Sequence, residues 1–522
     1  MSVKRTLTAA KTLILLTTLA VASSVLAPER AFATVPELSD VTHVAAGGAH
    51  TCAVKIDASL QCWGYNGHGQ LGDGTLANHP TPEDVLGLGS GVTTVAAGGT
   101  HTCAITMAAG LKCWGENYGR LGNGTTTMNS SIPVDVVGLG SGVAAIALGG
   151  YHTCALTTTG AAKCWGSNEY GQVGDGTSGI GNNVRSTPMD VVGLDSDIAA
   201  LTAGFLHTCA LTADGGVKCW GRNDSGQLGD GSMTDSNVPV DVLGLASGVV
   251  AISAGGYYTC ALTTAGGVTC WGNNQYGQLG NGTMTSSALP VDVAGLQGDV
   301  TAVSGAYYFH ACALTTDGDV MCWGRNHFGQ LGNDTYADSS TPVSVVGLGS
   351  DDVVSLVGGG HQNCVLLTSS SVRCWGSNTA GELGDGSTTS RSSPVTVLTP
   401  VPGSDLDGDN CTDFRELASY AFLGGARNPK NFWDFFDTPD LNAMPQRDKA
   451  ISISDITRVV GRFGTTGNAG IDPLSKPPAT GYHTAFDRTT IGPNAWNAGP
   501  PNGSITIEDI LNVVHQFGHS CA

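Results

Sequence analysis

The sequence predicts an all-β protein, a seven-bladed β-propeller of four-stranded blades, followed by a small, mainly helical C-terminal domain. Three observations predict the propeller. A block of about 51 residues recurs seven times over residues 34–400, each block carries two cysteines ten positions apart, and each contains four short apolar runs. A fixed period of this length is typical of solenoids and propellers. A closed ring leaves only short, protected sheet edges, which favours the propeller.

The N-terminal segment, residues 1–33, has the pattern of a signal peptide. Lys4, Arg5 and Lys11 precede or flank an apolar run at 13–26, and an A-x-A cleavage site follows at 31–33. An uncleaved N-terminal anchor is the alternative. After residue 34 no stretch is long and apolar enough to span a bilayer. We therefore expect a secreted, extracellular or cell-surface protein with no membrane span in the mature chain.

One block shows the expected strands in order. A β-branched run, VTTVAA at 92–97, leads through a glycine pair into HTCAIT at 101–106. A turn separates this segment from LKCWG at 111–115, and the glycine-rich turn GRLGNGT precedes IPVDVV at 132–137. Apolar runs of this length bounded by turn residues predict strands. The GLGSG segments between blocks superficially resemble phosphate loops, but no helix follows them, so we interpret them as turns.

Alternation along the strands indicates that both faces of each blade are apolar. In HTCALT, Cys209 and Leu211 point to one face and Ala210 to the other, and in VKCWG, Cys219 and Trp220 point to opposite faces. A sheet packed between two neighbours needs this pattern. We expect the repeated tryptophans to be core residues, a sugar-stacking platform being the alternative: Trp63, Trp114, Trp165, Trp220, Trp271, Trp323 and Trp375.

Sixteen cysteines in a chain with an export signal indicate disulfides, because no CxxC spacing for zinc occurs. Facing residues of an antiparallel hairpin lie ~4.5–5.5 Å apart at Cα, within disulfide range. The expected hairpin pairs are Cys52 with Cys62, Cys103 with Cys113, Cys154 with Cys164, Cys209 with Cys219, Cys260 with Cys270, Cys312 with Cys322, and Cys364 with Cys374. Cys411 and Cys521 remain, and a bridge between them would tie the ends of the C-terminal part together.

A histidine stands two residues before the first cysteine in five blocks, at His50, His101, His152, His207 and His310. A metal or substrate ring near the central channel is one interpretation. Tyr258 and Gln362 break that ring, so we expect each histidine to bond a neighbouring backbone instead. A catalytic or partner-specific residue is needed once and should break the repeat. The repeat-breaking segments are 177–187, 306–311 (AYYFHA) and 359–364 (GGHQNC).

The block resembles the regulator of chromosome condensation repeat family. The matching residues are the G-G-x-H-T-C-A-L entry, the W-G-x-N-x-x-G-Q-L-G-D/N-G-T core and the P-V-x-V exit, seven times over residues 40–400. The resemblance implies a seven-bladed propeller, closed by PVTVL at 394–398 pairing with the first unit. The family's namesake is a nuclear exchange factor that binds chromatin. This chain differs in its signal peptide and paired cysteines and resembles exported bacterial members, so we expect no nucleotide exchange.

Residues 401–522 follow a Pro/Gly linker and contain a pattern typical of a calcium loop. Counted from Asp405, carboxylates stand at positions 1, 3, 5, 9 and 12, the ligand spacing of an EF-hand-like loop. Asn410 replaces the usual glycine at position 6. A solvated acidic linker is the alternative. The expected calcium ligands are Asp405, Asp407, Asp409, Asp413 and Glu416.

A second duplication follows, because 448–464 (DKAISISDITRVVGRFG) matches 502–518 (NGSITIEDILNVVHQFG). Each copy places apolar residues on one helical face. The arrangement resembles a dockerin, in which two calcium-loop-plus-helix segments form a module that docks to a cohesin. The copies depart from the dockerin pattern in spacing and in their first ligand positions. The resemblance implies further candidate calcium ligands: Asp448, Asp455, Asn502 and Asp509.

These features together predict a secreted, non-enzymatic, monomeric binding or scaffold propeller that presents loops to an extracellular protein or glycan. A calcium-dependent C-terminal module would attach it elsewhere. The formal net charge of −20 disfavours nucleic acid as a partner. Two alternatives remain open. The first is a polysaccharide-active secreted enzyme or a component of a dockerin-type complex. The second is an inhibitor of a secreted enzyme, which would need an exposed aromatic patch formed by residues such as Tyr307, Tyr308 and Phe309.

Overall fold

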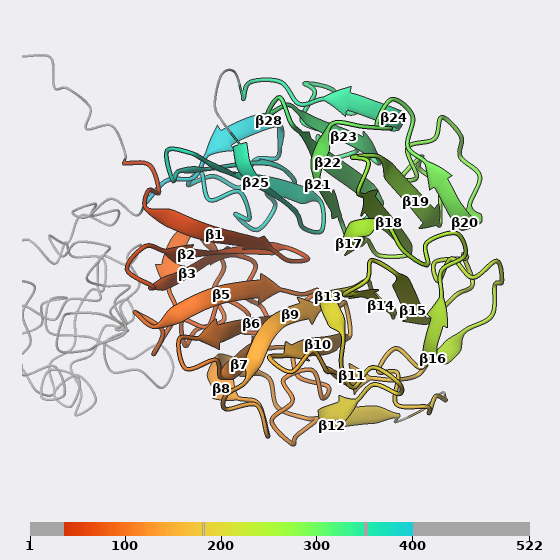
Figure 1. Ribbon diagram of the computed structural model, residues 1–522. Coiled ribbons are helices and arrows are strands. Elements are labelled where there is room, and N and C mark those ends of the chain that lie inside the picture. The colour runs from red at the N-terminus through yellow and green to blue at the C-terminus, as the bar shows by residue number, and fades with distance from the viewer. Residues whose placement is uncertain (1–35, 180, 182, 349–352, 400–522) are drawn as a thin grey trace, which may run out of the picture. The chain divides into compact units, whose positions relative to one another are not determined.

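A computed structural model describes residues 36–179, 181, 183–348 and 353–399, in which 28 strands form seven four-stranded antiparallel sheets. The predicted all-β propeller is therefore confirmed (Figure 1). The signal peptide, the calcium module with all its expected ligands and Cys411 and Cys521 lie outside the described residues. Within the described ranges, no helix is long and apolar enough to cross a bilayer.

Each blade is one contiguous stretch of sequence. The first comprises β1 (Val41–Ala46), β2 (His50–Lys55), β3 (Leu60–Gly64) and β4 (His79–Asp84); the second comprises β5 (Val92–Ala97), β6 (His101–Thr106), β7 (Leu111–Gly115) and β8 (Ser130–Asp135). The third comprises β9 (Val143–Leu148), β10 (His152–Thr157), β11 (Ala162–Ser167) and β12 (Val184–Asp190); the fourth comprises β13 (Ile198–Ala203), β14 (His207–Thr212), β15 (Val217–Gly221) and β16 (Ser236–Asp241). The fifth comprises β17 (Val249–Ala254), β18 (Tyr258–Thr263), β19 (Val268–Gly272) and β20 (Ser287–Asp292); the sixth comprises β21 (Val300–Gly305), β22 (His310–Thr315), β23 (Val320–Gly324) and β24 (Ser339–Ser344). The seventh comprises β25 (Val353–Gly358), β26 (Gln362–Leu367), β27 (Val372–Gly376) and β28 (Arg391–Thr396).

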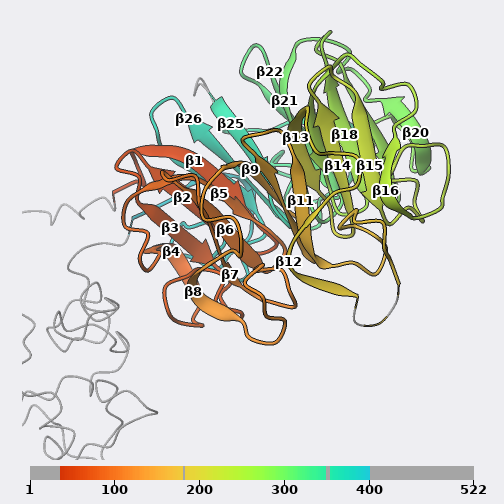
Figure 2. The ribbon, with the colours of Figure 1, turned by 60° about the horizontal axis from the view of Figure 1, so that its bottom comes forward.

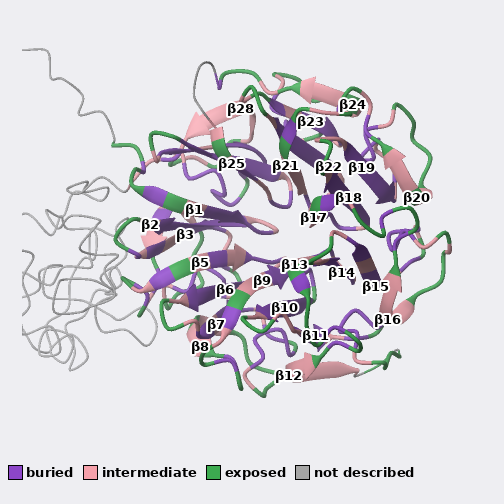
Figure 3. Cartoon of the chain, in the orientation of Figure 1, coloured by how far each residue is buried: buried purple, intermediate pink, exposed green. Residues whose placement is uncertain are grey.

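The first strand of each blade lies on the inside of the ring and the fourth on the outside. The first strands of successive blades, from β1 round to β25, pack against one another and β25 returns to β1 (Figures 1 and 2). The second and third strands are almost wholly buried, whereas the fourth strands are half-buried (Figure 3). Proline and serine are frequent in these outer strands, as expected for sheet edges.

All seven expected hairpin disulfides are present in the structure. They join Cys52 to Cys62, Cys103 to Cys113, Cys154 to Cys164, Cys209 to Cys219, Cys260 to Cys270, Cys312 to Cys322, and Cys364 to Cys374. In each blade the two bridged residues face each other directly in the register of the second and third strands. The Cα atoms are 4.0–4.1 Å apart, closer than the spacing expected from the sequence. All these cysteines are fully buried, so the disulfides, which we call staples, lie inside the packed blade interfaces and not on the surface.

Neighbouring blades share one core through opposite faces. Cys209 and Leu211 of the fourth blade pack against Trp271 of the fifth, whereas Ala210 and Trp220 pack against the third blade. The predicted alternation is confirmed, and all seven tryptophans are completely buried core residues. Each interface thus matches the indole of one blade to the aliphatic face of the blade before it.

The predicted pairing of residues 394–398 with the first unit is confirmed only at their end, where Val397 and Leu398 bond to the residues that precede β1. β28 pairs with β27, in its own blade, and the first blade already has four strands of its own. A short bridge, Glu37 to Leu398 with Leu38 N donating to Val397 O at 2.9 Å, links the two ends of the propeller. Packing also closes the ring, because Trp63 of the first blade packs against Leu366 and Val397 of the seventh.

Candidate binding site at the loop face

The loops that join the first and second strands of the blades meet at one end of the ring, which we call the loop face. They comprise residues 47–49, 98–100, 149–151, 204–206, 255–257, 306–309 and 359–361. A backbone N–H of each loop donates to a carbonyl of the next, from Gly48 to Gly98 at 2.9 Å round to Gly360 to Gly47 at 2.8 Å. A Cβ added to Gly360 would lie 1.9 Å from the Gly48 carbonyl oxygen, so this close approach requires glycine.

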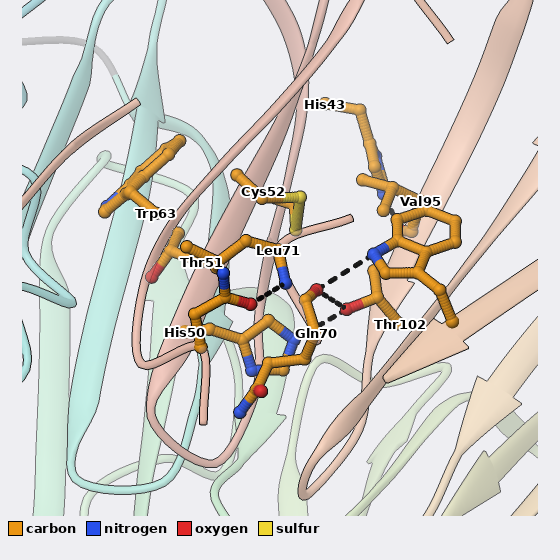
Figure 4. Close-up of a disulfide and its surroundings, with 12 residues drawn as sticks. His43, His50, Thr51, Cys52, Trp63, Gln70, Leu71, Val95 and Thr102 are labelled. Atoms are coloured by element: carbon orange, nitrogen blue, oxygen red, sulfur yellow. Dashed lines mark hydrogen bonds between the residues drawn. A yellow bond between two sulfur atoms is a disulfide. The ribbon is translucent and has the colours of Figure 1, made fainter. Parts of the chain in front are cut away.

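Beneath these loops, the repeated histidines join each blade to the next. His50 Nε2 lies 2.8 Å from Thr102 Oγ1, and that hydroxyl donates to the Gln70 carbonyl, which also accepts from Trp114 Nε1 (Figure 4). The prediction of a backbone partner is therefore wrong, because the partner is a side chain of the next blade. The same contact recurs at His101–Thr153, His152–Thr208, His207–Thr259 and His310–Asn363.

This network fixes the protonation of the histidines. The single threonine hydrogen points to a carbonyl, so Nε2 must carry the hydrogen donated to Oγ1, and the buried Nδ1 has no partner. At the four histidine–threonine contacts a second proton would have no acceptor. Burial accordingly lowers the pKa of His50, His152 and His207 to about 3 and of His310 to about 4, and holds the pKa of His101 well below its usual range. These are structural histidines.

The two blades without this histidine use a different contact. Ala311 replaces the accepting threonine of the sixth blade, and Tyr258 of the fifth reaches past it to donate to the His310 carbonyl. Gln362 Nε2 of the seventh donates to the Gly47 carbonyl at 3.0 Å. In the part of the chain that the structure describes, no group of three or more His, Cys, Asp or Glu side chains is arranged to hold a metal ion.

The loop face surrounds the central opening of the ring, which we call the mouth. Aromatic side chains of the third to sixth blades fill one side of it. The loop of the sixth blade is one residue longer than that of the fifth, and Phe309 in it has a φ of 70°, unusual for a bulky residue. Tyr307 Oη donates across the ring to the Leu148 carbonyl of the third blade, and the Tyr307 ring stacks on Phe205 with centroids 5.4 Å apart. Burial raises the pKa of the Tyr307 hydroxyl.

Three arginines extend this surface with cation–π contacts. The guanidinium of Arg120 lies 4.9 Å from the Tyr151 ring centroid, and that of Arg325 lies 4.9 Å from Tyr276. Arg222 is held between Tyr170 and Tyr257. Tyr118 and Tyr151 are 63% and 47% exposed. The loop face is therefore an aromatic surface that is accessible to a partner.

The remaining part of the mouth, at the seventh, first and second blades, is a pocket of 340 Å³. Its aromatic wall comprises Tyr308, Phe328 and His361, with Tyr65 among the other lining residues. His361 stacks on Tyr308 with ring centroids 4.3 Å apart, and burial lowers the pKa of His361 to about 3. Glu382, which is only 2% exposed, also lines the pocket.

Two of the three repeat-breaking segments, 306–311 and 359–364, meet at this mouth. The third, around 177–187, joins β11 to the outer strand β12, where Arg185 pairs with Asp175 at 2.6 Å; none of the residues of this segment that the structure describes lines the pocket. Sequence reasoning did not identify Glu382. Its signal was visible, since Glu382 stands where five other blades have glutamine in the G-Q-L-G motif.

The comparisons with known proteins agree with this architecture. The RCC1-like domain profile matches residues 113–415, and profiles of the regulator of chromosome condensation (RCC1) repeat match 58–105 and 41–70. The ultraviolet-B receptor UVR8 of Arabidopsis thaliana is 30% identical over 364 residues, covering 68% of this chain and 81% of that protein. The human E3 ubiquitin-protein ligase HERC2 is 32% identical over 339 residues, 63% of this chain but only 7% of HERC2.

Two solved structures share the fold. Human WBSCR16 is 21% identical with a TM-score of 0.58, covering 67% of this chain and 95% of that chain. Prp20p of Saccharomyces cerevisiae is 20% identical with a TM-score of 0.58, covering 68% and 88%. The profile match and the seven repeats show that this chain belongs to the RCC1-like family of β-propellers.

Proposed function

We propose that this protein is an exported, non-enzymatic binding protein whose loop face receives a protein partner. The observation that carries the proposal is the meeting of two repeat-breaking segments, 306–311 and 359–364, on one accessible aromatic surface. Exposed aromatic residues together with arginine are typical of interface centres. Relatives described as a receptor and a ubiquitin ligase, and Prp20p with its binding to Gsp1p and histones, support a role in protein recognition.

Export fits the seven buried disulfides, which form and persist in oxidising compartments. The signal peptide and the C-terminal calcium module belong to the proposal as sequence-based expectations. In this arrangement, calcium held by residues such as Asp405 and Glu416 orders the C-terminal module, which attaches the protein to a surface or assembly. The propeller is then free to present its loop face.

The test compares two sites on the same protein. The full exported chain captures partners from its native medium, and the captured partner is then titrated against variants. We expect the pair Tyr118→Ala and Tyr151→Ala to weaken binding at least tenfold. Met107→Ala is the matched control, because Met107 is 69% exposed in the hairpin turn at the opposite end of the blade. Equal losses in both variants, or a loss only in the control, would refute the proposal.

A second candidate, an inhibitor that covers the active site of a secreted enzyme, is favoured by the same aromatic surface. Tyr308 lines the pocket, and Tyr308 and Phe309 are both half-buried, so they could enter a partner's cleft. Loss of a captured enzyme's activity on stoichiometric addition of the protein would support this candidate. Full activity in the saturated complex would exclude it.

A further inference from the structure

The pocket at the mouth exists because the loops around the ring differ in one position. The last residue of the loop between the first and second strands is small in two neighbouring blades, Ala49 and Thr100, and large in the others, for example Tyr151 and Tyr257. The large side chains and Tyr307 close one side of the mouth. The small ones leave open the space that Tyr308 and His361 border from the other side.

Glu382 gives this pocket a charge that the repeat does not require. In five other blades a glutamine at this position accepts a hydrogen bond from the backbone N–H two residues earlier, as in Gln70 and His68 at 3.0 Å. Glu382 keeps that bond, from Ala380 N at 2.7 Å, and its second oxygen accepts from Ser377 Oγ at 2.7 Å. Glutamine is therefore sufficient for the fold at this position, and the fold does not require a carboxyl group here.

The carboxyl group of Glu382 has no cation of its own among the residues that the structure describes. No lysine, arginine or histidine of those residues lies within ion-pair distance of it. Among the described residues that line the pocket, it is the only Asp, Glu, Lys or Arg, and His361 beside it is kept neutral at ordinary pH. Nearby Arg120 is already paired with Glu116 at 2.6 Å. A cation that enters the pocket would supply the ion-pair partner that this buried carboxyl group lacks.

The walls indicate which kind of cation fits. Calcium and magnesium take several oxygen ligands, whereas this pocket combines one carboxyl group with aromatic rings. Aromatic faces attract ammonium groups and pack against alkyl chains. We propose that the pocket binds an alkylammonium group, the chemistry of a lysine side chain or a free amine, with Glu382 as counter-ion and Tyr308 and Phe328 against its alkyl part. This deepens the proposed function and rests on it, since a partner's lysine would enter here.

Calorimetric titration of the full exported chain with small probes tests the proposal without a partner. n-Butylammonium and Nα-acetyl-lysine-methylamide should bind saturably, and the uncharged Nα-acetyl-norleucine-methylamide should not. Glu382→Gln should weaken the amines at least tenfold and leave the unfolding midpoint unchanged. Asp224→Asn is the control, because it removes one equal charge from a half-exposed loop-face carboxyl in the fourth blade.

Two further arms identify the source of the ligand. If the pocket prefers the lysine amide and Glu382→Gln no longer captures the partner, the ligand is a lysine of the partner. If the pocket prefers n-butylammonium and Glu382→Gln still captures the partner, the ligand is a free amine. Both outcomes support the proposal. It is overturned if neither amine binds, if the norleucine amide binds equally, if Glu382→Gln changes nothing, or if only neutral sugars bind. Partner capture that survives any of these results leaves the proposed function standing.

Discussion

We call the five buried histidines that join neighbouring blades the junction histidines. Replacing one of them by glutamine tests quantitatively whether these imidazoles are neutral in the folded protein. His207 is completely buried, its Nδ1 has no partner, and burial lowers its pKa to about 3. In the unfolded chain the same imidazole has a pKa of ~6.5. Below pH ~6.5 the imidazole binds a proton in the unfolded state but not in the folded state. Stability therefore falls as the pH drops from about 6.5 toward the folded pKa.

The magnitude follows from proton linkage. Between pH 7.5 and 5.5, one such histidine removes ~1.4 kcal/mol from the free energy of unfolding. Five buried junction histidines together remove ~7 kcal/mol, as much as the whole stability of many domains. Glu83 acts in the opposite direction, because burial raises its pKa to about 7 and the folded state gains a proton first. A single substitution isolates the histidine from such other groups.

The assay is chemical denaturation of the oxidised protein at pH 7.5 and 5.5. The loss of stability between the two should be smaller by ~1.4 kcal/mol in His207→Gln, because glutamine serves at the equivalent position of the seventh blade. The reciprocal variant Gln362→His introduces the repeated histidine into the seventh blade and should enlarge the loss by ~1.4 kcal/mol. An identical loss in all three proteins would refute the assignment of neutral buried histidines.

Three other predictions concern the ring, the staples and the C-terminal module. Gly360→Ala should lower the unfolding midpoint more than Gly89→Ala, because a Cβ at Gly360 meets the Gly48 carbonyl at 1.9 Å whereas one at Gly89 meets nothing within 4 Å; equal midpoints would contradict the loop ring. Replacing Cys209 and Cys219 together by alanine should cost ~3 kcal/mol or more, from loop-closure entropy and the cavity, measured by denaturation; an unchanged stability would show that this staple adds nothing. Chelation of calcium should speed proteolysis within 403–522 and leave the propeller's melting unchanged; equal destabilisation of both parts would count against two domains.

The fold was predictable because the repeat presents each structural signal seven times. Period-two alternation around Cys209 and Trp220 predicted two apolar faces, and the shared cores confirm them. The ten-residue spacing predicted the hairpin staples, whose register matches. The four apolar runs of each block also predicted which strands form one blade, from 92–97 to 132–137 in the second. The pairing of β28 with β27 in the seventh blade confirms this division.

The site was predictable only in part, because its contacts join residues far apart in the chain. The segments 306–311 and 359–364 were identified as breaks in the repeat, and both lie at the mouth. The bond from Tyr307 to Leu148 spans 159 positions and has no local signature. The threonine that accepts from His50 lies one block further on, so a backbone partner was expected instead. Glu382 was not identified, although it departs from the glutamine of the motif.

Hydrogen–deuterium exchange of the exported chain, free and with its captured partner, tests the central claim that the loop face is the binding surface. We expect partner-dependent protection in the loops at 306–309 and 359–361 and in the neighbouring loop at 149–151. The hairpin turns at 56–59 and 107–110, at the other end of the blades, should exchange at the same rate in both samples. Protection of those turns, with the three loops unchanged, would contradict the account.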